Sequence, residues 1–108
     1  MTELAIGTRV DMPFEETVDA TREALAEQGF GVLTEIDMKA TLKAKLGEDM
    51  EDYLILGACN PQYAYKALQA ENKIGAMLPC NVIVQETEDG RVEVSAVNPL
   101  ASMQAVEN

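Results

Sequence analysis

Two valine-rich segments, residues 80–86 (CNVIVQE) and 91–97 (RVEVSAV), flank the stretch TEDG, and this pattern constrains the fold more than any other feature. Alternating apolar and polar residues on both sides of a turn sequence predict a β-hairpin. A two-residue Asp-Gly loop would place Val84 opposite Ser95. Directly opposed side chains share a face of the sheet, so that register would mix the apolar and polar faces.

A three-residue loop, Glu88-Asp89-Gly90, places Val84 opposite Val94 instead and keeps the apolar face continuous. It also puts Gly90 at the position where such a loop needs a left-handed residue. We therefore predict this register, which brings Cys80 opposite Asn98.

The remaining segments alternate between the two periodicities. In chain order we expect a strand at 4–10, a helix within 11–29, a strand at 30–36, a helix at 37–47, an apolar inner strand at 53–59, and a helix from 61 to about 74. The expected fold is α+β in two layers. It has a mixed or antiparallel sheet of about five strands with helices packed on one face, in the order β-α-β-α-β-α-β-β-α.

The motif AVNP at 96–99 resembles ACNP at 58–61, where a strand meets the start of a helix. Asn98-Pro99 is therefore expected to open a last helix, with Leu100, Met103 and Val106 facing inward. No C-cap signal precedes the final residue, so we expect this helix to be truncated. We expect residues 1–108 to form a single domain.

The formal net charge is −11, from 19 acidic and 8 basic residues. This charge disfavours nucleic acid and anionic membrane surfaces as partners, because both require a basic protein surface. No signal peptide or membrane-spanning apolar run is visible, so a cytoplasmic location is expected. The helix at 37–47 carries a local cluster of lysines, either a solvated face or a docking patch for an anion or an acidic partner: Lys39, Lys43 and Lys45.

Cys59 ends the apolar strand, directly before Asn60 and Pro61, which are expected to start the next helix as its N-cap and first residue. The helix dipole at this position favours a thiolate, whereas burial among apolar residues raises the pKa of a thiol. Cys59 is therefore either a reactive thiol or a buried packing residue, and the apolar strand favours packing.

Cys80 starts a strand on its apolar side, and Asn81 points to the other face. If the helix after Cys59 crosses back over the sheet, the two cysteines lie a strand length apart, on the order of 20 Å, which disfavours an intrachain disulfide. The extended piece GAMLP (75–79) could instead return the chain, and a disulfide between subunits stays open.

A soft metal ion such as Cu(I) could use the two thiolates with Met77 or Met103, but no metal-binding motif is present. Histidine is absent, and no nucleophile elbow or glycine-rich phosphate loop is visible. The sequence therefore favours a protein that is not an enzyme and identifies no cofactor.

The stretch YLILGACNPQYAYKALQAENKIGAMLPCNVIVQE (53–86), with IDMKATLKAKLG before it and VSAVNP after it, resembles the domain-of-unknown-function 302 family. The resemblance covers nearly the whole chain. It implies a compact α+β domain that self-associates, since dimers have been seen, and it implies no activity. Members usually carry a longer final helix, and this chain departs from them there.

Two functional hypotheses follow. The first is a homodimeric module that binds a small ligand or a protein partner. The second is a thiol-dependent redox or soft-metal protein that uses Cys59, Cys80 or both. The candidate site residues are Cys59, Asn60, Pro61, Cys80, Asn81 and Asn98.

Overall fold

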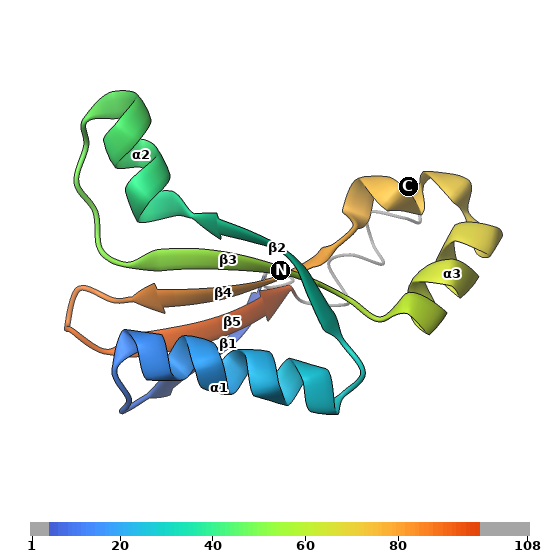
Figure 1. Ribbon diagram of the computed structural model, residues 1–108, viewed down its shortest axis with the longest axis horizontal. Coiled ribbons are helices and arrows are strands. Elements are labelled where there is room, and N and C mark those ends of the chain that lie inside the picture. The colour runs from blue at the N-terminus through green and yellow to red at the C-terminus, as the bar shows by residue number, and fades with distance from the viewer. Residues whose placement is uncertain (1–4, 98–108) are drawn as a thin grey trace.

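The computed structural model describes residues 5–97 (Figure 1). Its elements are β1 (Ala5–Val10), α1 (Phe14–Glu27), β2 (Gly31–Asp37), α2 (Met38–Leu46), β3 (Tyr53–Cys59), α3 (Pro61–Ala70), the 3₁₀ helix η1 (Asn72–Met77), β4 (Cys80–Glu86) and β5 (Val92–Val97). The strands form one antiparallel sheet in the order β1-β5-β4-β3-β2. The predicted α+β class with a five-stranded sheet is confirmed. The expected last helix, from Asn98, lies outside the described residues.

The hairpin of β4 and β5 has the predicted register, with Val84 opposite Val94 and Val82 opposite Ala96. Thr87 N donates to Arg91 O at 2.7 Å and closes a three-residue loop. Gly90 in that loop has a φ of 80°, a conformation that glycine adopts without strain. The predicted partner of Cys80, Asn98, lies outside the described residues.

The core lies between the sheet and α1, which forms the second layer. Its buried side chains come from three inner strands: Leu54, Leu56, Val82, Val84 and Val92. Phe14, Val18 and Leu25 of α1 pack against them, as the helical periodicity predicts. Thr17 is also fully buried. Its hydroxyl donates a hydrogen bond to Pro13 O at 2.9 Å, so the buried hydroxyl has a partner.

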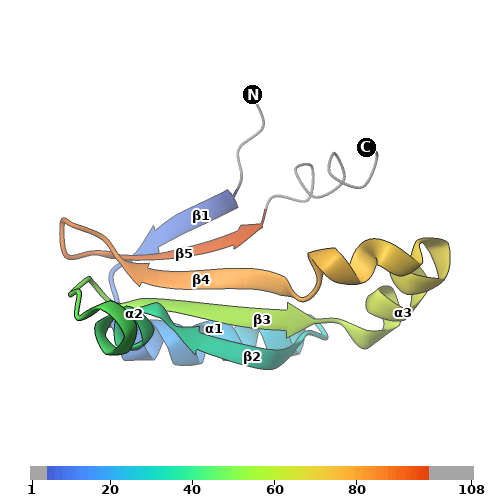
Figure 2. The same ribbon diagram turned by 90° about the horizontal axis from the view of Figure 1, so that it is seen from above.

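The other two helices stand at opposite ends of the sheet (Figures 1 and 2). Asp37 caps α2 by accepting from Ala40 N at 2.9 Å. Two of the three lysines singled out in the sequence form ion pairs with the acidic connection that follows α2, Lys39 with Asp52 and Lys43 with Asp49. Within residues 5–97, no helix is long and apolar enough to cross a membrane.

The third helix is shorter than predicted. It ends at Ala70 because Glu71 adopts an extended backbone (φ −150°, ψ 107°), and the Glu71 carboxylate accepts from Lys73 N at 3.0 Å to start η1. The chain therefore leaves the sheet along α3 and returns along η1, so that the connection does not cross the sheet (Figure 2).

Candidate functional site

Both cysteines lie at the same end of the sheet. Strands β3 and β4 are antiparallel neighbours, and Ala58 is directly opposite Cys80. Cys59 is one residue further along, so the Cα atoms of the two cysteines are about 6 Å apart from strand spacing and rise. The predicted separation of about a strand length is wrong, because α3 and η1 return the chain to the point where it left.

The two thiols nevertheless point away from each other. Side chains alternate along a strand, so Cys80 shares the α1 face with Ala58, and Cys59 lies on the opposite face. Cys80 is exposed, Cys59 is half-buried, and both are free. A disulfide requires Cβ atoms directed toward each other, which this alternation prevents.

A pocket of about 280 Å³ lies between the end of β3 and α3, and both cysteines line it. Its walls are formed by Phe30, Leu78 and the α3 residues Tyr63, Ala64 and Ala67. The two alanines leave the space between helix and strand open, because a larger side chain at either position would enter it. None of the lining residues carries a charge.

Asn60 and Pro61 begin α3 beside this pocket. Asn60 Oδ1 accepts hydrogen bonds from Gln62 N at 3.2 Å and Tyr63 N at 3.3 Å, and Pro61 occupies the first turn. The side-chain oxygen of Asn60 therefore caps the helix. A backbone N–H in the first turn of a helix has no partner within the helix, and proline fits there because it has no N–H. Both residues position the pocket wall.

Asn81 lies on the other side of β4 and lines a second hollow, of about 380 Å³, with Met77, Ile83 and the ends of β1 and β5. Cys80 borders this hollow as well. Three of the predicted site residues, Cys59, Asn60 and Cys80, thus line one pocket, and Pro61 follows Asn60 beside it. Asn81 lines the neighbouring hollow. Asn98 lies outside residues 5–97.

Gly57 is a positioning residue that sequence reasoning missed. A Cβ atom at this residue would collide with Thr34 Oγ1 and would lie 2.7 Å from Pro79 Cγ. Pro79 and Thr34 therefore pack directly over the Gly57 backbone, and Pro79 immediately precedes Cys80. The signal was a glycine inside the apolar strand YLILGAC, which often marks a close approach of another segment.

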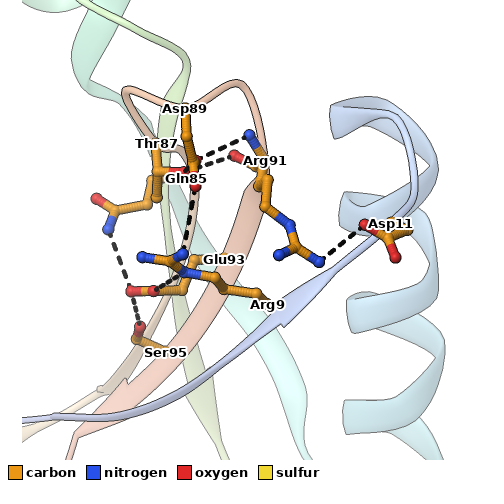
Figure 3. A network of polar contacts seen from close by, with 8 residues as sticks. All are labelled: Arg9, Asp11, Gln85, Thr87, Asp89, Arg91, Glu93 and Ser95. Atoms are coloured by element: carbon orange, nitrogen blue, oxygen red, sulfur yellow. Dashed lines mark hydrogen bonds and ion pairs between the residues drawn. The ribbon is translucent and has the colours of Figure 1, made fainter.

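A polar network on the hairpin surrounds Glu93 (Figure 3). Its carboxylate accepts from Ser95 Oγ at 3.3 Å and Gln85 Nε2 at 3.5 Å, and lies 3.6 Å from Arg9 Nε. Arg9 also pairs with Asp89 at 3.3 Å. These contacts join β1 to β4 and β5, so the network has a structural role.

Asp89 in this network has a pKa below its ordinary value, chiefly because the Thr87 hydroxyl donates to its carboxylate. The backbone N–H of Arg91 and the charge of Arg9 act in the same direction. Across the part of the chain that the structure describes, no group of three or more Cys, Asp or Glu side chains is arranged to hold a metal ion.

Comparison with known proteins gives a family but no activity. A family model described as "Domain of unknown function DUF302" matches residues 6–108. An uncharacterized protein of Aquifex aeolicus (strain VF5) is 28% identical over 87 residues, which cover 81% of this chain and 54% of that protein. The chain thus spans about half the length of this curated relative. A crystal structure of an uncharacterized conserved DUF302 protein from Bacillus stearothermophilus superposes with a TM-score of 0.91 at 27% identity, over 99% of this chain and 83% of that one.

Proposed function

The chain belongs to the family of the domain of unknown function DUF302, and because that membership assigns no activity, we propose its function from the site itself. The protein is a homodimeric, non-enzymatic module that binds a small, neutral, largely apolar molecule in the pocket between β3 and α3. The observation that carries this proposal is the uncharged pocket that Cys59 and Cys80 both line. Two free thiols suit the reducing cytoplasm.

The chemistry of the pocket supports a neutral ligand. An ion buried there would have no opposite charge among the lining residues, and burying an unpaired charge is costly. An anion would also be repelled by the net charge of −11 that the protein carries. The volume of about 280 Å³ is at the lower end for ligand pockets, which indicates a molecule smaller than most cofactors.

A filled-pocket variant tests the ligand site, with 2-naphthol as a neutral aromatic probe. We expect 2-naphthol to shift the amide NMR signals of residues 58–60 and 63–67, and those of Leu78 and Cys80. Ala67→Phe should abolish these shifts, because Ala67 lines the pocket. Ala70→Phe is the matched control, since Ala70 lies on the same helix, is exposed and is not a lining residue. Unchanged spectra of the wild type, or equal shifts in Ala67→Phe, contradict the ligand site.

Thiol-dependent redox or soft-metal binding is the second candidate. The neighbouring backbone positions of Cys59 and Cys80 favour it, whereas the opposite directions of their side chains count against it. A Cu(I) titration against a chelator of known affinity separates the candidates. Tight binding that both Cys59→Ser and Cys80→Ser abolish would replace the small-ligand proposal.

Self-association is supported by large apolar side chains that are exposed in the single chain, several of them close together on α3 and η1. Burial of such a patch against a second protein surface is favourable. Light scattering on protein eluted from a size-exclusion column should give twice the mass of one chain at micromolar concentration. A monomer at that concentration contradicts the homodimer.

A further inference from the structure

The segment formed by α3 and η1, residues 61–77, is called the arm here. None of its residues is buried, and its two helices pack on each other beyond the ends of the strands (Figure 2). Short helices in proteins are stabilised mainly by packing of an apolar face. The arm of a single chain has little of that packing, so its apolar face is available to a partner.

The arm concentrates exposed apolar side chains. Four of the nine large hydrophobic residues that are exposed in residues 5–97 belong to it: Tyr63, Tyr65, Leu68 and Met77. Tyr63 borders the ligand pocket. Tyr65 lies about 160° from Tyr63 around the helix, on the side away from the pocket, and Leu68 follows it at the spacing of one helical face. Tyr65 is 65% exposed and is not among the residues that line the pocket.

The arm also differs in charge from the rest of the protein. It contains Lys66 and Lys73 against one acid, Glu71, and so carries a formal charge of +1. Since the whole chain carries −11, the remaining residues carry −12. A partner surface complementary to the arm is apolar at its centre and acidic at its edge.

A second copy of this chain has such a surface. A groove of about 330 Å³ lies where α1 begins, lined by the half-buried apolar residues Phe14 and Val18 and by the core residue Leu54, which is 6% exposed. Glu15 and Asp19 lie on its rim, and within residues 5–97 neither is paired with a cation. The other rim groups are already engaged, because Arg22 pairs with Glu35 and Asp37 caps α2.

The arm and the groove lie at opposite ends of the sheet. The arm follows Cys59 at the end of β3, whereas Leu54 in the groove lies near the start of that strand. The arm of a chain therefore does not fill the groove of the same chain. In an antiparallel, two-fold arrangement, each arm reaches the groove of the other copy, which is the reciprocal contact that a closed dimer requires.

We propose that two copies of this chain associate by placing the arm of each in the α1 groove of the other. Tyr65 and Leu68 contact Phe14 and Val18, and Lys66 and Lys73 face Glu15 and Asp19. This inference rests on the homodimer of the proposed function and specifies its interface.

Charge reversal on both surfaces tests this interface by sedimentation equilibrium. Lys66→Glu with Lys73→Glu should weaken the dimer, and Glu15→Lys with Asp19→Lys should weaken it equally. The combination of all four changes on one chain should restore it. Because exposed ion pairs are individually weak, each reversal is expected to raise the dimer Kd roughly tenfold. Lys45→Glu, at an exposed lysine outside the arm, is the matched control and should leave Kd unchanged.

The outcomes separate the interface from the homodimer itself. A monomeric wild type overturns both. A wild-type dimer that is unaffected by Tyr65→Glu and by the reversals retains the homodimer and overturns the arm–groove contact. Weakening by both reversals without restoration in the combined variant also overturns the pairing of arm with groove.

Discussion

Ala58 and Cys80 lie directly opposite each other on the antiparallel strands β3 and β4. Because of this pairing, the backbone of Cys59 lies close to that of Cys80 on the adjacent strand, while the two thiols point to opposite faces of the sheet. The similar motifs ACN and PCN therefore converge on one pocket without forming a cysteine pair.

The two thiols should differ in reactivity. Cys80 is exposed and Cys59 is half-buried, so a disulfide reagent such as Ellman's reagent should modify native protein in a fast and a slow phase. Cys80→Ser should remove the fast phase, and Cys59→Ser the slow one. In 6 M urea both thiols should react together. An intrachain disulfide between Cys59 and Cys80 in the unreduced protein would contradict the opposite directions of the two side chains.

Gly57→Ala should destabilise the fold. The added Cβ would meet Pro79 Cγ at 2.7 Å and Thr34 Oγ1, and the proline ring cannot rotate away as a flexible side chain can. Overpacking of this kind costs about 1–3 kcal/mol of unfolding free energy, measurable by urea denaturation.

Gly75→Ala is the control for this change, because a Cβ at Gly75 meets no atom within 4 Å. Thr34→Ala in the Gly57→Ala background should recover part of the stability and leave the clash with Pro79. Equal stability of the Gly57→Ala variant and the wild type would show that Pro79 does not pack over Gly57.

The parts of the fold that local patterns determine could be predicted from sequence. Alternation and Gly90 specify the pairing of Val84 with Val94, and the Asp37 side chain specifies the start of α2. The position of Cys80 relative to Cys59 depends instead on the path of residues 60–79. That path is set by the break at Glu71, where a single residue leaves the helical conformation within a sequence that otherwise favours helix.

Asn60→Ala should lower stability by about 1 kcal/mol, since the Asn60 side chain accepts from two backbone N–H groups at the start of α3. Asn60→Asp preserves the acceptor and should keep most of the stability. If Asn60 acts through the cap alone, Asn60→Asp should also retain the 2-naphthol shifts. Loss of binding with retained stability would instead assign Asn60 a direct contact with the ligand.

Acid should weaken the hairpin through Asp89. The pKa of Asp89 is lowered in the folded protein, which means that the folded protein stabilises the ionised carboxylate relative to the unfolded chain. The stabilisation is therefore complete above the ordinary aspartate pKa of about 3.9 and is lost as pH falls through the lower folded value. Asp89→Asn should reduce unfolding free energy at pH 7, and the difference from wild type should shrink toward pH 2.

Thr87→Val identifies the cause of this dependence. The Thr87 hydroxyl is the largest influence on the pKa of Asp89, so its removal should return that pKa toward the ordinary value. Titration of the Asp89 carboxyl carbon by NMR measures the change directly, and Arg9→Gln should produce a smaller rise, because its charge contributes less. A larger effect of Arg9→Gln than of Thr87→Val would show that charge, and not the hydroxyl, holds Asp89 ionised in the loop.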